Sequence, residues 1–366
     1  MSGYATDINL LLFLLLLPYL YVMMRVYRGL TLISLAEPGH VRLPKLSVVI
    51  ATNRSPEALE TILRDLSVQN YSHDNFEIII ADDSHGKWEQ FIAEAVPLHP
   101  AVRVVPNPAT GKKSALAAAV ATAEGDLIVT TDDDCSVGPS WLLSIASFYN
   151  RYRPDMIICP VELTGADTLF TKIQQLEFSS LQGVTAGSAA LGDPLMCNGA
   201  ALAFKREAYP LSGKALNESA RSGDDVFFLH YLKKRGAVIE WLESPEATVR
   251  TEAASTLFSL FRQRSRWASK SVYYSDPSTI VTGLAVLTAS VITAAMLIYS
   301  IFNPAFIPHA FALLLLKSVP DILIVMNRLQ FQGRTELLAW FPVVQLLYPF
   351  YVVIAFVAGL FRTRKW

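Results

Sequence analysis

Apolar residues gather along the chain in two ways, as long runs near both ends and as short runs in the middle. The long runs, which carry almost no charge, cover residues 8–24, 279–302, 305–326 and 337–361. A helix needs about 20 apolar residues to cross a bilayer. The pattern therefore predicts a transmembrane anchor over residues 1–30 and a carboxyl-terminal transmembrane region of two to three spans over residues 279–361.

The short apolar runs lie between these flanks and alternate with segments of helical spacing. Strands are predicted at residues 46–51, 76–81, 102–105 and 127–131, and helices at 58–69, 88–96 and 113–123. Strands that read as continuous apolar runs are typical of a parallel sheet covered on both faces. We therefore expect an α/β domain, with a mostly parallel sheet and helices on both faces, over residues 40–250.

Charge separates the central domain from the flanks. Charged residues make up 17% of the chain, below the ~25% of ordinary soluble domains. Of the 63 charged residues, 52 lie in residues 37–276. This distribution excludes a simple soluble enzyme and a disordered chain. The net charge of −1 offers no basic face for a polyanion, so no nucleic-acid partner is expected.

The charges around the first long run predict its orientation. Asp7 precedes the run, and Arg25 and Arg28 follow it. A cleaved signal peptide would carry positive charge before the run and small residues after it, so an uncleaved anchor is expected. Because basic residues favour the cytoplasmic side, the central domain is predicted to be cytosolic, in a protein of the inner or plasma membrane of a bacterium.

Two features of the carboxyl-terminal region leave alternatives open. Lys317 and Asp321 lie four residues apart, on one helix face, and are expected to pair in the interior of the helix bundle. An intramembrane charge pair is also a hypothesis for a functional site. Pro342 and Pro349 leave open whether the last run crosses the membrane or re-enters it.

Acidic residues follow two of the predicted strands. Asp82 and Asp83 follow one, and Asp132, Asp133 and Asp134 follow another. Parallel sheets bind ligands at the carboxyl ends of their strands. A turn or a helix cap explains a single aspartate, but three in succession repel one another unless something neutralises them. A hard divalent cation with oxygen ligands does so, which predicts a Mg2+ or Mn2+ site at Asp132 and Asp134.

A third acidic pair and a basic segment complete the candidate chemistry. Asp224 and Asp225 precede an amphipathic helix at 226–235, and because one cap does not need two acids, at least one is expected to be functional. Residues 251–275 predict a basic amphipathic helix at the membrane surface.

The basic segment is expected to contact both lipid and ligand. Arg262, Arg264 and Lys270 are predicted to face anionic lipid. Arg266 and Trp267 can do more, because a guanidinium binds diphosphate oxygens in a bidentate way and an indole offers a stacking face.

Taken in order, these motifs resemble the membrane-bound family 2 glycosyltransferases, which include cellulose, chitin and hyaluronan synthases and the ceramide glucosyltransferases. The motifs are VVIATNR at 48–54, IIIADDS at 78–84, GKKSAL at 111–116, TTDDDC at 130–135, CNGAALAF at 197–204, SGDDVFFL at 222–229 and QRSRW at 263–267. The resemblance implies a GT-A type fold, which binds a nucleotide sugar, attached to transmembrane helices.

The resemblance also implies roles for residues around the donor. Asp82 and Asp83 correspond to the site for the nucleotide base and ribose, with Asp82 the better candidate for the base. Lys112 resembles the lysine of the family's Gly-Lys pair near the donor. Asp132 and Asp134 correspond to the D-x-D motif, which holds a divalent cation on the diphosphate.

Further roles follow from the same resemblance. Asp225 matches the second acid of the E-D motif, the general base, and Asp224 replaces the usual Glu. Gln263, Arg266 and Trp267 match Q-x-x-R-W, which lies over the donor diphosphate and the acceptor entrance.

The expected activity is therefore an inverting, metal-dependent transfer of a sugar from a nucleotide-diphosphate sugar to a hydroxyl group. A UDP-sugar is the expected donor, and a lipid or glycan at the membrane is the expected acceptor. Membrane lipids are expected as further partners. Arg54, where the family commonly has an acid, departs from the pattern. A polysaccharide synthase of the same family is an alternative, although the few carboxyl-side spans weigh against it.

A phosphatase of the haloacid-dehalogenase type is the alternative from another class. It would use Asp132 to Asp134, Lys205 or Lys214, and Gly223-Asp224-Asp225. Two features oppose it. NESARS rather than a strand precedes Gly223, and strand–helix units precede Asp132 to Asp134, where that family usually has almost none. A non-catalytic membrane scaffold or receptor is a third reading, which the acids at all three loops oppose.

Overall fold

The computed structural model describes residues 2–36, 44–84, 88, 102–211 and 223–361. The chain forms two compact units. One, here called the sheet unit, comprises Ile33–Gly165 and Gly192–Glu252, and the other, the helical unit, comprises Met1–Leu32, Ala166–Leu191 and Ala253–Trp366. Residues 166–191 thus lie inside the predicted 40–250 domain in sequence but pack with the helical unit.

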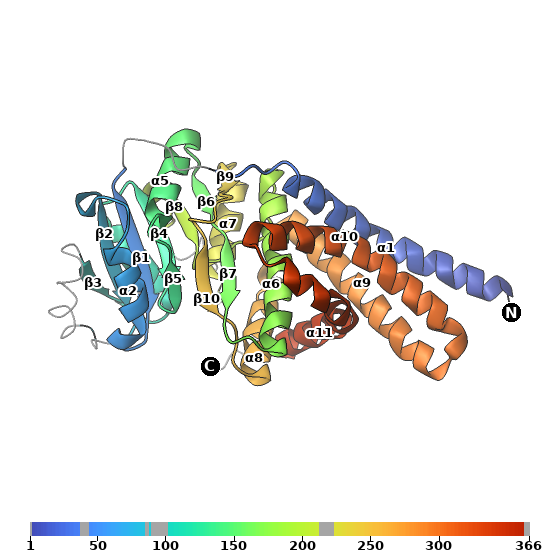
Figure 1. The fold of residues 1–366 in the computed structure, drawn as a ribbon. Coiled ribbons are helices and arrows are strands. Elements are labelled where there is room, and N and C mark those ends of the chain that lie inside the picture. Colours follow the sequence, from blue (N-terminus) through green and yellow to red (C-terminus); the bar gives the residue numbers. More distant parts are fainter. Residues whose placement is uncertain (1, 37–43, 85–87, 89–101, 212–222, 362–366) are drawn as a thin grey trace. The chain divides into compact units, whose positions relative to one another are not determined.

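A seven-stranded sheet forms the centre of the sheet unit (Figure 1). In spatial order its strands are β3 (Val102–Pro106), β2 (Phe76–Asp82), β1 (Leu46–Thr52), β4 (Leu127–Asp132), β8 (Leu202–Lys205), β6 (Met156–Ile158) and β9 (Ile239–Trp241). The first four are mutually parallel, and β8 runs antiparallel to both of its neighbours. The mostly parallel α/β sheet predicted from the sequence is confirmed, and its four predicted strands are β1 to β4.

The central strands form where β-branched residues are buried on both faces of the sheet. Val48, Val49 and Ile50 of β1 are fully buried, as are the three isoleucines of β2. Branched side chains at Cβ pack well on a pleated surface. Parallel pairing places Thr52 beside Asp82, and Ala51 beside Asp132, so the acidic ends of β2 and β4 lie at the same edge of the sheet, on either side of β1.

Short helices and a second sheet complete the sheet unit. The helical segments are η1 (Pro56–Leu59), α2 (Glu60–Ser67), η2 (His73–Asn75), α4 (Lys112–Thr122), α5 (Trp141–Tyr152), η3 (Arg206–Ala208) and α7 (Asp224–Lys234). A three-stranded sheet pairs β10 (Val249–Glu252) with β5 (Cys135–Val137) and β7 (Val161–Thr164). The helices predicted at 58–69, 113–123 and 226–235 are confirmed; the one predicted at 88–96 lies outside the described residues.

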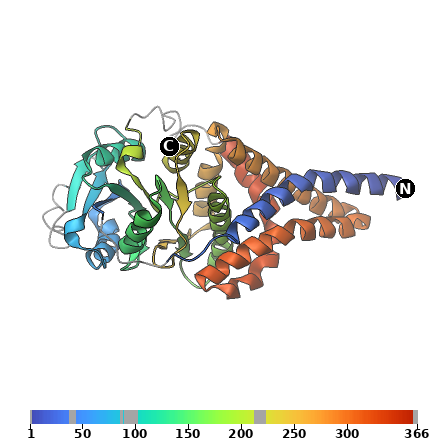
Figure 2. The ribbon, with the colours of Figure 1, turned by 90° about the horizontal axis from the view of Figure 1, so that it is seen from above.

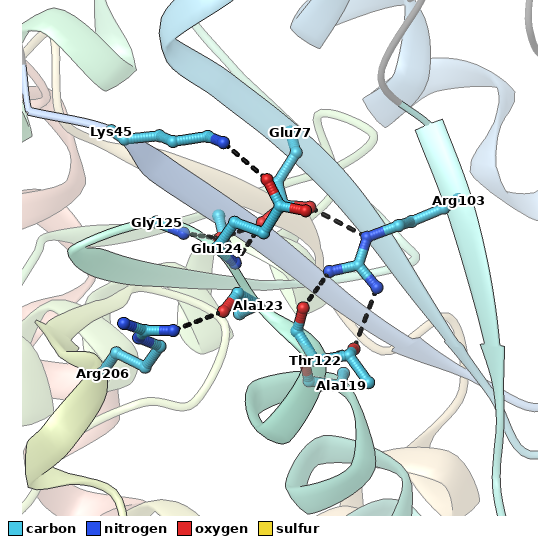
Figure 3. A network of polar contacts seen from close by, with 10 residues as sticks. Lys45, Glu77, Arg103, Ala119, Thr122, Ala123, Glu124, Gly125 and Arg206 are labelled. Carbon is cyan, nitrogen blue, oxygen red and sulfur yellow. Dashed lines mark hydrogen bonds and ion pairs between the residues drawn. The ribbon is translucent and has the colours of Figure 1, made fainter.

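A network of polar contacts covers the amino edge of the seven-stranded sheet (Figure 3). The buried carboxylate of Glu77 accepts hydrogen bonds from Ser47 Oγ at 2.6 Å, the backbone N–H of Glu124 at 2.7 Å and Arg103 Nε at 2.9 Å. Burial alone would raise the pKa of Glu77, but these donors outweigh it and leave the pKa below its usual range. Arg103 also donates to Thr122 Oγ1 at 2.9 Å.

The helical unit consists of long helices that run beside one another (Figures 1 and 2). Its elements are α1 (Ser2–Leu30), α6 (Leu169–Ala190), α8 (Leu257–Ala268), η5 (Ser271–Tyr273), α9 (Pro277–Phe302), η6 (Pro304–Phe306), α10 (Ile307–Gln332), η7 (Thr335–Trp340) and α11 (Phe341–Phe361). By length and composition, four segments of the described chain can cross a membrane, namely Leu12–Leu30, Pro277–Phe302, Pro304–Gln332 and Thr335–Phe361.

A buried polar cluster joins three of these helices. Lys317 Nζ, on a side chain that is 0% exposed, lies 2.7 Å from Asp321 Oδ2, which confirms the pairing predicted from their spacing. Gln345 Nε2 donates to the same carboxylate at 2.9 Å, and the Tyr19 hydroxyl donates to its other oxygen. Since each charge has close partners, the cluster links α1, α10 and α11 without leaving these groups unsatisfied.

Candidate active site

The carboxyl edge of the seven-stranded sheet gathers the acids of two loops. Asp82 is the last residue of β2, and Asp132 is the last residue of β4. Asp82 is buried, and its Oδ1 accepts a hydrogen bond from the backbone N–H of Ser84 at 2.7 Å. This local contact holds the carboxylate at the end of its strand.

Asp83 holds the loop that leads into α4. Its carboxylate accepts hydrogen bonds from the backbone N–H of Gly111 at 2.9 and 3.0 Å and from Asn107 Nδ2 at 2.6 Å. Gly111 has φ +95°, a conformation that side-chain-bearing residues rarely adopt. The predicted contact of Asp83 with the donor stays a prediction, while in this structure Asp83 positions the turn that presents Lys112.

Lys112 is the first residue of α4 and lies among carboxylates. Its Nζ donates to Asp132 Oδ1, and Asp224 and Asp225 are close enough to attract its charge. Desolvation works against that charge, but the three carboxylates outweigh it and raise the pKa of Lys112. The structure thus brings together Lys112, the D-x-D loop and the acidic start of α7, as the sequence predicted for one site.

Two residues near the end of β1, Thr52 and Arg54, contact the other two acids of the D-x-D loop. Arg54 Nη2 lies 3.2 Å from Asp134 Oδ2, and its Nε lies 3.6 Å from Asp133 Oδ1. Thr52 Oγ1 donates to Asp133 at 2.6 Å. Burial raises the pKa of Asp133 despite these partners. Arg54 was noticed in the sequence only as a departure from the family pattern, because its partners lie about 80 residues away.

The D-x-D residues fit a divalent cation as part of a ligand set. The side chains of Asp132 and Asp134 are 33% and 46% exposed and offer hard carboxylate oxygens. Within the described ranges, no group of three or more His, Cys, Asp and Glu side chains is arranged to hold a metal. The two carboxylates therefore suit a Mg2+ or Mn2+ ion only as part of a ligand set that other groups complete.

A backbone contact fixes Asp225 at the start of α7. Its Oδ2 accepts a hydrogen bond from Gly199 N–H at 3.2 Å, and its Oδ1 one from Val226 N–H at 2.8 Å. Thr130 Oγ1 of β4 donates to the carbonyl of Gly199 at 2.8 Å. Gly199 therefore links Asp225 to the strand that ends in Asp132, a role that sequence reasoning did not assign.

The Q-x-x-R-W residues lie on α8 in the helical unit. Gln263, Arg266 and Trp267 are each partly buried there. The prediction that Arg264 and Lys270 face lipid is wrong, since their exposed fractions are 4% and 9%. Arg264 pairs instead with Glu177 of α6. The prediction that Arg262 faces lipid stays a prediction; that side chain is exposed.

The mostly parallel sheet, with acids at the carboxyl ends of its strands, is GT-A-like. Residues 47–210 match the family described as Glycosyl transferase family 2. The chain carries a glycosyltransferase family 2 domain. This match sets the haloacid-dehalogenase reading aside.

Two curated relatives illustrate the family. A β-monoglucosyldiacylglycerol synthase from Trichormus variabilis is 26% identical over 244 residues, which cover 64% of this chain and 51% of the relative. An N-acetylglucosaminyltransferase from Sinorhizobium fredii is 25% identical over 243 residues, which cover 62% of this chain and 57% of the relative. The chain thus spans about half the length of the curated relatives it matches.

A solved structure supports the fold over nearly the whole chain. A mannosyltransferase from Pyrobaculum calidifontis, in complex with GDP-Man and Mn2+, matches with a TM-score of 0.62. The match covers 98% of this chain and 99% of that one at 17% identity. At this identity the similarity shows the GT-A-like fold alone.

Proposed function

We propose that the protein transfers a sugar from a nucleotide-diphosphate sugar to a hydroxyl of a lipid-like or other membrane-associated acceptor, with inversion at the anomeric carbon. The observation that carries the proposal is the grouping of Lys112, Asp132 and Asp225 at the carboxyl edge of a family 2 domain. This grouping supplies the ammonium group of Lys112 beside a leaving phosphate and the carboxylate of Asp225 beside an attacking hydroxyl.

The donor side of the proposal assigns the nucleotide and the diphosphate to different residues. Asp82 and Asp83 are proposed to contact the base and ribose, and Lys112, Gln263 and Arg266 to contact the donor. Asp132 and Asp134 would hold a divalent cation, which when bound neutralises the departing diphosphate. The mannosyltransferase of similar fold was solved with GDP-Man and Mn2+, so Mn2+ is the first cation to test; a UDP-sugar is the first donor to test and GDP-mannose the second.

The acceptor side rests on Asp225. Its carboxylate is held by two backbone N–H groups, from Gly199 and Val226, so its position is defined before the acceptor binds. As general base it takes the proton of the acceptor hydroxyl while the oxygen attacks the anomeric carbon. Because no protein nucleophile takes part, one displacement occurs and the configuration inverts. Asp224 is proposed to assist the transfer because its negative charge attracts the ammonium group of Lys112.

The membrane context supports an acceptor at the bilayer. Four segments of the described chain are long and apolar enough to span it, and one relative is named a glucosyldiacylglycerol synthase. Arg25 and Arg28 follow the first span, which supports a cytosolic catalytic domain in a bacterial inner membrane. Trp267 is proposed to lie at the acceptor entrance.

A panel of nucleotide sugars with purified protein in detergent and membrane lipid extract tests the proposal. Release of a nucleoside diphosphate, with a lipid heavier by one sugar in the mass spectrum, is the expected result. A ladder of products would instead indicate a polysaccharide synthase. Release of inorganic phosphate, or no reaction with any donor and extract, would contradict the proposal.

A further inference from the structure

An ion pair in the helical unit fixes α8 to α6. Arg264 of α8 is 4% exposed, and its Nη2 lies 2.5 Å from Glu177 Oε2 of α6. The hydroxyl of Tyr351 on α11 donates to the other oxygen of Glu177 at 3.4 Å. The glutamate is thus held from two helices, and it fixes the position of the guanidinium in turn.

The same guanidinium contacts two residues of the Q-x-x-R-W motif. Arg264 Nη1 donates to Gln263 Oε1 at 3.1 Å. The guanidinium carbon lies 4.1 Å from the centre of the Trp267 ring, a stacking distance. Arg264 therefore contacts Glu177 on one side and both motif side chains on the other.

Helix geometry explains why these contacts are needed. Residues three apart are neighbours on a helix, which brings Arg264 under Trp267. The side chains of adjacent residues point in different directions around a helix. The hydrogen bond from Arg264 is therefore what directs the Gln263 amide toward the guanidinium. A planar guanidinium can stack and donate in several directions at once, whereas an ammonium group cannot stack in this way.

We propose that Arg264, anchored by Glu177, is a positioning residue that sets the side chains of Gln263 and Trp267 for the donor and acceptor. The inference rests on the proposed function, which gives these two side chains their task. Arg264 itself contacts no substrate and acts through its two neighbours. Small displacements of positioning groups cost rate steeply, so we expect losses of about 10- to 100-fold in kcat/KM when the stacking is removed.

Arg264→Lys is the main test, because it keeps the charge beside Glu177 and removes the flat stacking surface. The Tm is expected to stay within a few degrees of the wild type, while kcat/KM falls by about 10- to 100-fold. In a Trp267→Leu background the same change should have a much smaller effect, since the ring it positions is gone. Arg262→Lys, an exposed change on the same helix, is the matched control and should leave transfer unchanged.

The emission of Trp267 gives a readout that does not depend on turnover. The chain has 6 tryptophans, so the spectrum of Trp267 is taken as the difference between each protein and its Trp267→Leu counterpart. We expect Arg264→Lys to shift that difference spectrum and Arg262→Lys to leave it in place. This comparison decides the matter if Trp267→Leu is too slow for kinetics.

The possible failures are distinguishable. If the wild type transfers no sugar from any donor, the proposed function fails, while the emission test still reports on the contact. If Arg264→Lys has wild-type kcat/KM and an unshifted Trp267 spectrum, the positioning role is overturned. Equal, multiplicative losses in both backgrounds together with a lowered Tm would also overturn it, because they would indicate a purely structural ion pair.

Discussion

The carboxylates at the two edges of the seven-stranded sheet differ in their exposure to solvent. At the amino edge, Glu77 is buried and accepts three hydrogen bonds, from Ser47, Arg103 and the backbone of Glu124 (Figure 3). At the carboxyl edge, the side chains of Asp132 and Asp134 are 33% and 46% exposed and pair with Lys112 and Arg54. Asp82, Asp83 and Asp133 lie at the same edge.

This difference separates a carboxylate that stabilises the fold from carboxylates available to a ligand. A buried acid whose carboxylate accepts several hydrogen bonds from the protein is poorly available to a substrate or ion. Several acids grouped at one edge repel one another, which costs stability until a cation arrives. The comparison leads to five predictions, in which changes at the carboxyl edge affect activity or cation binding and changes at the amino edge affect stability.

Loss of the cation site is expected to have the largest effect. Asp134→Ala, or a chelator in excess, should abolish sugar transfer, because Asp134 is a half-exposed acid of the D-x-D loop. Mn2+ binding to the protein, followed by electron paramagnetic resonance, should be lost as well. Glu124→Ala, an exposed acid of the amino edge paired with Lys45, is the control and should keep both. Full activity in excess chelator would refute the metal assignment.

Asp225→Asn is expected to reduce turnover by about 100- to 10,000-fold, the usual cost of losing a general base. The asparagine keeps the shape and can still accept from Gly199 N–H, but it cannot take the acceptor proton. Donor affinity, measured by calorimetry, should remain near the wild type. Asp224→Asn should be milder. If Asp224→Asn is the more damaging change, the base has been assigned to the wrong residue.

Glu77→Gln should weaken the hydrogen-bond network at the amino edge and lower the folding stability, without changing catalysis. An amide cannot accept from Arg103 and the other donors as a carboxylate does, which is expected to cost about 1–3 kcal/mol of folding stability. Thermal unfolding in detergent checks this, with kcat/KM measured below the lowered Tm and expected to be unchanged. A large loss of kcat/KM at a normal Tm would contradict the separation of the two edges.

The pH dependence of that stability has a defined sign. The pKa of Glu77 is lowered in the folded state, so its contribution is present above the ordinary glutamate value of about 4.3. It is lost as the pH falls through the folded-state value. Between neutral pH and acid, wild-type stability should therefore fall more than that of Glu77→Gln.

Local sequence patterns predicted several strands of the sheet well. They did not predict which residues far apart in the sequence would contact one another. The apolar runs predicted β1, β2 and β4 because these strands are buried on both faces, and predicted β3 as well although it is only partly buried. The spacing of Lys317 and Asp321 gave their pair because the contact lies within one helix turn. The antiparallel β8 was not predicted, since four residues among Gly and Ala carry little pattern.

The candidate site shows the same limit. Its acids were visible because they follow strands, but the pairing of Arg54 with Asp134 joins residues 80 positions apart. An amphipathic pattern likewise shows which face of a helix is polar without showing what covers it. Arg264 was therefore assigned to lipid, although its partner is Glu177, 87 positions away.

The smallest predicted effect concerns the competition between Arg54 and a cation at the carboxyl edge. Arg54 Nη2 lies 3.2 Å from Asp134, so a metal ion that binds Asp134 must compete with the guanidinium. Exposed ion pairs contribute about 0.2–1 kcal/mol. Arg54→Gln is therefore expected to tighten Mn2+ binding by up to about 5-fold, measured by electron paramagnetic resonance on protein without donor.

The control for Arg54 is Arg64→Gln, which removes an arginine paired with Glu60 on α2 and should not change Mn2+ affinity. Unchanged affinity in Arg54→Gln would mean that the ion does not use the carboxylate of Asp134 that the guanidinium contacts. Weaker binding would mean that Arg54 holds Asp134 in the geometry the ion needs. In that case the carboxyl edge would be preorganised by its basic residues, as the amino edge is by Arg103, and the contrast between the edges would lie in exposure alone.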